Sequence, residues 1–244
     1  MVAPTLVARR LAKALLPALA LLIYGCGDTP PPTTPEPTAT PTPINPQAIL
    51  DDCGRAMSTL TSFGFRVEHE DDGGTPLDQG MVLTEASGSV SGSDRLAVEF
   101  SGTAGSFAVK GSLIATGENV YMTNPLSGEW HAVSSALNPL AFFEPSQGIA
   151  DILLQVRDTT LISHDSAEYR IGGTLPAVAL APLFGETDAQ SSVNVTLTID
   201  KVSLYLTRTR LEGRITPNEA DGLVRTITLS QFDEPVNIAI PDRG

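Results

Sequence analysis

Histidine and serine side chains could carry acid–base or nucleophilic chemistry in this chain, but their spacing does not match a catalytic motif. His69, His131 and His164 lie far apart in strand-like sequence and lack the close spacing of metal ligands. No serine lies in a Gly-x-Ser-x-Gly nucleophile elbow, and no glycine-rich phosphate loop opens a helix. We therefore expect no catalytic residue, no cofactor and no metal. A hydrolase whose triad assembles only in space stays as the least favoured alternative.

Two groups of acidic side chains could bind calcium, which prefers several oxygen ligands. One is the pair Asp51 and Asp52, and the other comprises the acidic residues between Glu68 and Asp72. Neither group has the spacing of an EF-hand loop. We interpret both as solvated charges at a helix start and in a turn.

Cys26 is the residue for which the sequence predicts a specific reaction. A basic segment, residues 9–13, precedes an apolar run, residues 14–23, which is the arrangement of a secretory signal. The run is shorter than the roughly 20 residues that span a bilayer. An aliphatic Leu22 three positions before Cys26, and a small Gly25 directly before it, resemble the bacterial lipobox. The thiol would then carry a diacylglycerol that anchors the protein at the extracytoplasmic face of the cell membrane; an ordinary signal peptide is the alternative.

The chain is acidic, with 15 Lys and Arg against 28 Asp and Glu and a net charge of −13. Removal of residues 1–25 would take away three basic side chains and leave a net charge of about −16. Such a surface repels phosphate backbones, so we expect no nucleic-acid partner. It also disfavours adhesion to anionic lipid, which makes a covalent anchor more necessary.

Residues 29–46 contain eight prolines and six threonines and almost nothing apolar. Such a segment cannot bury enough surface to fold, and its prolines favour an extended polyproline II chain that reaches up to roughly 55 Å. We therefore predict a signal peptide over residues 1–25, a lipidated cysteine and a tether over residues 26–46, and one folded domain over residues 47–244.

A helix is predicted at the start of this domain, with Asn45 as its N-cap and Pro46 at its first position, where a missing N–H costs nothing. Apolar residues recur at helical spacing between Ile49 and Leu60. Cys53 lies on this apolar face with no base or metal-ligand pattern nearby. We therefore expect a small buried side chain and not a reactive thiol.

The rest of the domain alternates apolar and polar residues with the period of half-buried antiparallel strands. The clearest segments are residues 63–67, 96–100, 107–113, 195–199 and 236–240. Two helical patches, residues 149–156 and 177–184, interrupt the strands, and Pro182 is expected to kink or end the second. This pattern predicts an α+β fold in which helices pack on one face of a curved antiparallel sheet. Patterning does not decide whether the layers form a solid core or leave a cavity.

From Glu129 to Pro241, and more loosely from Ala56, the chain resembles the LppX/LprAFG family of lipoproteins. The resemblance rests on the order and spacing of short features: Leu60, Ser62, Phe63 and Phe65; Trp130, Pro139 and Pro145; Gly148-Ile149 and Leu153-Leu154; Tyr169 to Gly173; Leu197 to Asp200; and Leu229, Phe232-Asp233, Pro235-Val236 and Ile240-Pro241.

This resemblance implies a half-barrel of antiparallel strands with helices on its concave face around an apolar cavity, a fold similar to that of LolA, LolB and RseB. It also implies a non-enzymatic lipoprotein that carries lipid or glycolipid within the cell envelope, with an envelope lipid transporter as a further partner. From patterning we predict cavity-lining side chains at Phe65, Val98, Phe100, Val109, Ile152, Leu153, Leu180, Phe184, Val195, Leu197 and Ile199. The alternative is an RseB-like sensor or protein-interaction lipoprotein without lipid cargo, which predicts an exposed apolar patch or groove and a small internal void.

Overall fold

The computed structural model describes residues 43–241 apart from 71–72, 78–79, 126, 135–147 and 185. The predicted signal peptide, Cys26 and the tether up to Thr42 therefore lie outside the described residues.

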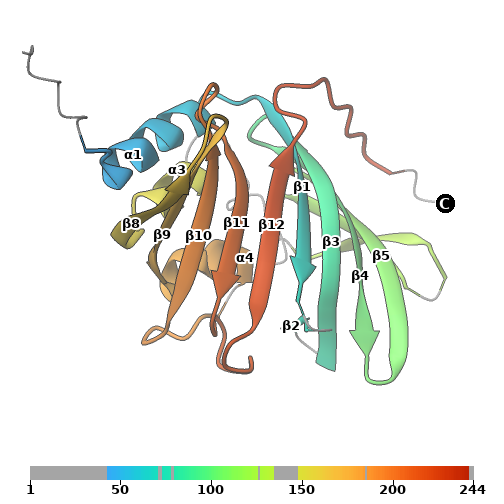
Figure 1. The fold of residues 1–244 in the computed structure, drawn as a ribbon. Helices are drawn as coiled ribbons and strands as arrows, with labels where there is room; N and C mark the ends of the chain where they lie inside the picture. The colour runs from blue at the N-terminus through green and yellow to red at the C-terminus, as the bar shows by residue number, and fades with distance from the viewer. Residues whose placement is uncertain are drawn as a thin grey trace, which may run out of the picture. The chain divides into compact units, whose positions relative to one another are not determined.

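The described residues form an antiparallel sheet of 12 strands, whose hydrogen-bonded order is β7-β6-β5-β4-β3-β1-β12-β11-β10-β9-β8, with β2 paired to β3 (Figure 1). Because β12 inserts between β1 and β11, the two ends of the domain meet in the middle of the sheet. The strands are β1 (Ser62–His69), β2 (Thr75–Pro76), β3 (Met81–Ser91), β4 (Arg95–Ala104), β5 (Phe107–Thr116), β6 (Asn119–Thr123), β7 (Trp130–Val133), β8 (Arg157–His164), β9 (Glu168–Pro176), β10 (Ser192–Asp200), β11 (Leu206–Glu212) and β12 (Val224–Ser230).

Helix α1 (Pro46–Met57) begins as predicted, because the Asn45 Oδ1 atom accepts hydrogen bonds from the backbone N–H groups of Gln47 and Ala48 at 3.0 and 3.4 Å. Pro46 occupies the first helical position. On the buried side, Leu50, Cys53 and Met57 recur at helical spacing and are almost fully excluded from solvent. The predicted burial of Cys53 is confirmed.

Three short helical segments follow among the described residues. Helix α3 (Gly148–Leu153) covers most of the first predicted patch. The second patch begins as a 3₁₀ helix, η3 (Ala177–Leu180), and continues as α4 (Ala181–Phe184). The change from 3₁₀ to α helix therefore precedes Pro182, which lies in the first turn of α4, where proline is tolerated. The helix ends two residues later, at Phe184.

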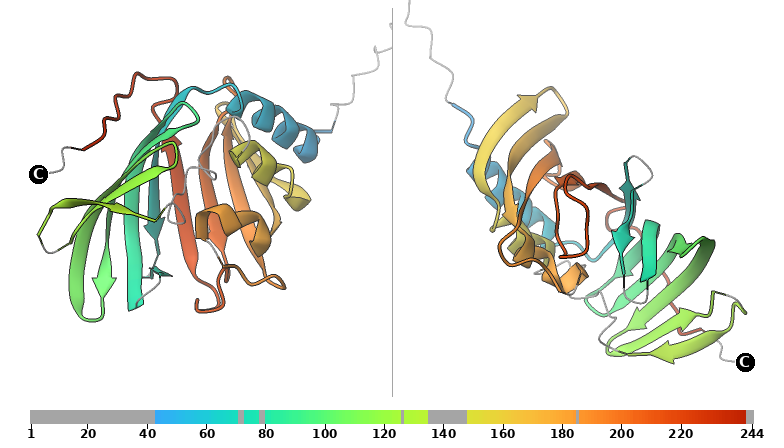
Figure 2. Two further views of the ribbon diagram at one scale, coloured as in Figure 1. Left: turned by 180° about the vertical axis from the view of Figure 1, so that it is seen from behind. Right: turned by 90° about the horizontal axis from the view of Figure 1, so that it is seen from below.

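The helices lie on one face of the half of the sheet formed by β8 to β12, as front and back views show (Figures 1 and 2). We call this the inner face and the opposite one the outer face. Strand alternation places Phe65 and Val67 of β1 inward, beside Leu229 and Ile227 of β12. The intervening Arg66 is exposed on the outer face. These apolar side chains thus lie on the inner face, as the alternation predicted.

The expected strand over residues 236–240 is wrong. Residues 231–241 run without strand pairing past the ends of β1, β3 and β4. The neighbours of β12 in the sheet, β1 and β11, already pair with β3 and β10 on their other sides. In addition, Pro235 and Pro241 lack the N–H that a strand ladder requires. The segment is held by side chains instead, since Asp233 Oδ1 accepts hydrogen bonds from Thr61 N and Oγ1 at 2.8 and 2.9 Å.

Candidate lipid-binding site

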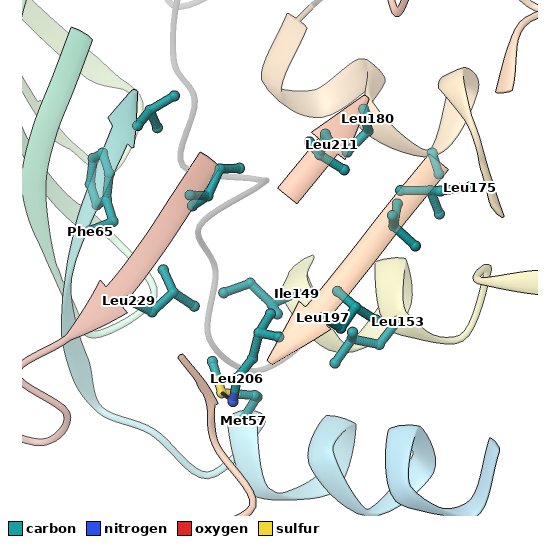
Figure 3. Packing of buried hydrophobic residues seen from close by; sticks show 14 of the residues in the cluster. Met57, Phe65, Ile149, Leu153, Leu175, Leu180, Leu197, Leu206, Leu211 and Leu229 are labelled. Atoms are coloured by element: carbon teal, nitrogen blue, oxygen red, sulfur yellow. Dashed lines mark hydrogen bonds between the residues drawn. The ribbon is translucent and has the colours of Figure 1, made fainter. Parts of the chain in front are cut away.

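An apolar cavity of about 50 Å³ lies between the inner face of the sheet and the short helices. Figure 3 shows buried side chains around it, among them Leu175, Leu197 and Leu211. This volume holds about four water molecules, so the protein's own side chains fill most of the space. Its lining residues are Ile149, Ile152, Leu153, Val156, Leu175, Leu180, Val195, Leu197, Leu206, Thr209, Leu211, Ile227 and Leu229.

The floor of the cavity is built by strand alternation and register. On β10, Val195 and Leu197 point to the inner face, and Val195 lies opposite Leu211 of β11. In turn, Thr209 of β11 lies opposite Ile227 of β12. Adjacent strands thus supply side chains at neighbouring positions, which forms a continuous floor that is apolar, apart from the Thr209 hydroxyl, in the part of the chain that the structure describes.

The roof consists of short helical segments. Helix α3 has six residues and contributes Ile149, Ile152 and Leu153, and the four-residue η3 contributes Leu180. Helices this short are marginal on their own, so packing against the floor holds them in place. At the edge of the cavity, Met57 Sδ at the end of α1 accepts a hydrogen bond from the Leu206 backbone N–H at 3.3 Å. The roof is therefore the more easily displaced wall.

No ionisable side chain of the described residues lines the cavity, but a buried ion pair lies beside it on the inner face. Arg225 of β12 is adjacent to the lining residues Ile227 and Leu211, and its guanidinium pairs with Glu219. Both side chains are 0% exposed. The carboxylate also accepts hydrogen bonds from two backbone N–H groups, at 2.7 Å from Ile215 and 3.3 Å from Thr216. Burial lowers the pKa of Arg225, and the nearby carboxylate opposes that shift.

A chain of hydrogen bonds connects this pair to His69. Arg225 Nε donates to Thr75 Oγ1 at 3.0 Å, and Thr75 Oγ1 lies 2.9 Å from His69 Nε2. His69 Nδ1 lies 2.8 Å from the Thr84 carbonyl oxygen, which can only accept, so Nδ1 carries the proton and Nε2 accepts from the threonine hydroxyl. Burial lowers the pKa of His69 below its ordinary value of 6.5, which favours this neutral form. The aromatic ring of Phe184 covers the guanidinium with its centroid 5.2 Å from Cζ.

Five predicted lining residues, Ile152, Leu153, Leu180, Val195 and Leu197, contribute to the cavity. The other six lie elsewhere. Phe65 and Ile199 are buried in the core, while Val98, Phe100 and Phe184 are partly buried against it. Val109 is half-buried on β5, close to the turn where Phe107 is 75% exposed.

Eight lining residues were not predicted. They are Ile149, Val156, Leu175, Leu206, Thr209, Leu211, Ile227 and Leu229. A usable signal existed for β12, where Arg225, Ile227 and Leu229 alternate with Thr226, Thr228 and Ser230. On β11, Thr209 interrupts the apolar positions and hides the period.

The cysteine thiol and two of the carboxylates that were considered for calcium binding are buried or paired. Burial raises the pKa of the Cys53 thiol to about 12, which leaves it protonated. Asp52 pairs with Arg55, and Glu70 pairs with Arg210 at 3.2 Å. In the described part of the chain, no group of three or more His, Cys, Asp or Glu side chains is arranged to hold a metal ion. Asp71 and Asp72 lie outside the described residues.

None of the helices in the described ranges is both long and apolar enough to cross a membrane.

Comparison with known proteins supports the fold. The model of the LppX_LprAFG lipoprotein family matches residues 45–238. The structure is similar to LprF from Mycobacterium bovis, with a TM-score of 0.60, 18% identity, and coverage of 80% of this chain and 96% of that one. It is also similar to the lipoprotein LppX of Mycobacterium tuberculosis, with a TM-score of 0.54, 21% identity, and coverage of 79% and 97%. No curated protein matches the sequence. Since the family model covers most of the chain, the protein belongs to the LppX_LprAFG lipoprotein family.

Proposed function

We propose that this protein binds the acyl chains of a lipid or glycolipid between the inner face of the sheet and the short helices, and carries them within the cell envelope. Anchoring through Cys26 at the extracytoplasmic face of the membrane, and exchange with an envelope lipid transporter, are parts of the same proposal. The observation that supports it is the cavity itself, which is apolar apart from Thr209 and is roofed by short helices.

An acyl chain requires more room than the closed cavity offers, since ligand pockets usually enclose roughly 300–1,000 Å³. The roof must therefore move outward when lipid enters. Transfer of a sixteen-carbon chain from water contributes about 12 kcal/mol. Full exposure of four roof side chains would cost roughly 6–12 kcal/mol, and the incoming chain replaces part of those contacts. The transfer free energy of a long apolar chain thus offsets the cost of opening the roof, whereas that of a small polar ligand does not. This favours lipid as the ligand.

The test compares bulky substitutions on the two faces of β10. Protein produced in a bacterial host is extracted with organic solvent, and the bound lipid is quantified by mass spectrometry. We expect lipid in the unmodified protein and at least about tenfold less in Leu197→Trp, which fills the cavity. The matched control Thr196→Trp places the same side chain on the outer face and should retain lipid. Far-UV circular dichroism checks folding, and Val195→Leu is a gentler filling variant.

Protein that is free of lipid, or equal lipid content in Leu197→Trp and Thr196→Trp, would contradict the proposal.

The small void favours a second candidate function, that of an envelope sensor or interaction lipoprotein without lipid cargo. Such a protein needs no room for a guest. Lipid-free protein in the same extraction, together with saturable binding of an envelope protein, would favour this second function over the first.

A further inference from the structure

A second hollow, of about 760 Å³ and open to solvent, lies on the outer face of the sheet. Its lining residues belong to β12, β1, β3, β4, β5 and β7, together with Gln231, which follows β12. The described helices lie on the other face, so none covers it (Figures 1 and 2). This hollow is therefore separate from the cavity under the helices.

Small residues on the outer face explain why the sheet is hollowed here. Ser87 and Ser89 of β3, Ala97 of β4 and Ser112 of β5 are small, so the floor between the longer side chains is low. Larger side chains surround this floor. One of them is Gln231, whose Oε1 atom lies 2.6 Å from the position that a Cβ atom on Gly64 would take.

The floor presents hydroxyl groups in cross-strand register. Arg66 of β1 lies between Thr228 of β12 and Ser87 of β3, and Ser87 is followed by Glu99 and Ser112 on the next two strands. Five hydroxyl groups line the hollow, and none of them forms a side-chain hydrogen bond with another described residue: Ser87, Ser89, Ser112, Thr228 and Ser230. These hydroxyls are free to donate to and accept from a ligand.

The charges in the hollow exclude an anionic ligand. Arg66 is paired with Glu85, whereas Glu68 and Glu99 form no ion pair with the described residues. The lining is therefore net negative, which repels phosphate and anionic head groups. Trp130, which is the only tryptophan of the chain, is half-buried at one end of the hollow.

We propose that this outer hollow binds a neutral glycan. A sugar ring presents C–H groups on its faces and hydroxyl groups around its rim, so it matches an indole face flanked by serine hydroxyls and carboxylates. The lining hydroxyls and the indole outnumber the two free carboxylates, which favours a sugar over a basic peptide. The glycan could come from a polysaccharide or from the head group of a glycolipid, since the recognised chemistry is the same.

Trp130 is a built-in reporter because no other tryptophan contributes to the fluorescence. The folded protein is titrated with soluble maltohexaose, mannohexaose and chitohexaose while tryptophan emission is recorded. We expect a saturable change with at least one of them, and at least about tenfold weaker binding in Ser87→Leu, which fills the floor. Thr196→Leu, on the outer face of β10 and away from the hollow, should bind like the unmodified protein.

If Ser87→Leu fails to fold, Glu99→Gln preserves the shape and should still weaken binding, because the amide replaces one strong acceptor by a donor. No saturable change with any of the three glycans, or unchanged affinity in a folded Ser87→Leu variant, overturns the proposal. A response to hexalysine but to no glycan also overturns it and identifies a site for a basic partner. Repeating the titration with a glycolipid that carries the bound glycan tells its source: tighter binding than to the free glycan indicates a head group, and equal binding indicates a polysaccharide.

Discussion

The buried ion pair between Arg225 and Glu219 is expected to be a major determinant of the stability of this domain. Arg225→Met keeps an apolar stem close to that of arginine but removes the guanidinium, so Glu219 is left in a fully buried site without a cation. Removal of one partner from a buried pair typically costs about 3–5 kcal/mol. Because the carboxylate keeps its hydrogen bonds from Ile215 and Thr216, we expect the lower end of that range.

A loss of about 3 kcal/mol corresponds to a decrease in Tm of roughly 6–12 °C for a chain of this size. Urea unfolding followed by far-UV circular dichroism measures the loss directly. The double variant Arg225→Met/Glu219→Gln should recover much of it, since the neutral amide can still accept from the same backbone N–H groups. The control Arg66→Met breaks the exposed pair with Glu85, whose side chains are 51% and 45% exposed, and should cost less than about 1 kcal/mol.

The reasoning is refuted if Arg225→Met costs no more than Arg66→Met. It is also refuted if the double variant is no more stable than Arg225→Met alone.

Two further predictions concern protonation and the end of the chain. Since the pKa of His69 is lower in the folded than in the unfolded state, unfolding takes up a proton, and we expect the free energy of unfolding to fall as pH decreases from about 6.5 towards that lower value. Urea unfolding between pH 5 and 7 should show this slope in the unmodified protein and in the exposed control His131→Gln, and a persistent slope in His69→Gln would contradict the assignment. Asp233→Ala removes the acceptor of the two hydrogen bonds from Thr61, so residues 231–241 should be released from the start of β1 and their amides should exchange faster. The control Glu234→Ala should leave exchange unchanged. Unchanged exchange in both variants would show that other contacts hold the segment.

Local features of the fold were predictable because their causes are local. The Asn45 side chain caps a helix whose first residue is Pro46, and both signals lie within a few residues of the structure that they determine. Alternation likewise predicted the strands around Phe65, Val98 and Leu197 and the face on which each side chain lies. The error at 236–240 has the opposite character. Its alternation is genuine, but the strands that it passes, β1, β3 and β4, already pair on both sides.

The strand residues predicted to line the site lie on the inner face of the sheet, but four of them lie outside the half that the short helices cover. Phe65, Val98, Phe100 and Val109 all belong to β1, β4 and β5, whereas the short helices cover the half formed by β8 to β12. Sequence patterning reports which face is apolar, but which strands lie under a helix depends on long-range pairing such as that of β1 with β12. The volume of the cavity depends on how far the roof closes on the floor, which no periodicity encodes.

Strand β12 links the two proposed sites, because its alternation serves both faces. Ile227 and Leu229 point into the cavity under the helices, while Thr228 and Ser230 line the outer hollow. A shift of one residue in its register with β1 or β11 would move the apolar pair to the outer face and the hydroxyls into the cavity, which would destroy both sites at once. Arg225 lies on the same strand and would leave its buried carboxylate partner in the same shift. The ion pair therefore opposes this slippage, so variants that break it should weaken acyl and glycan binding together, although Arg225 lines neither site.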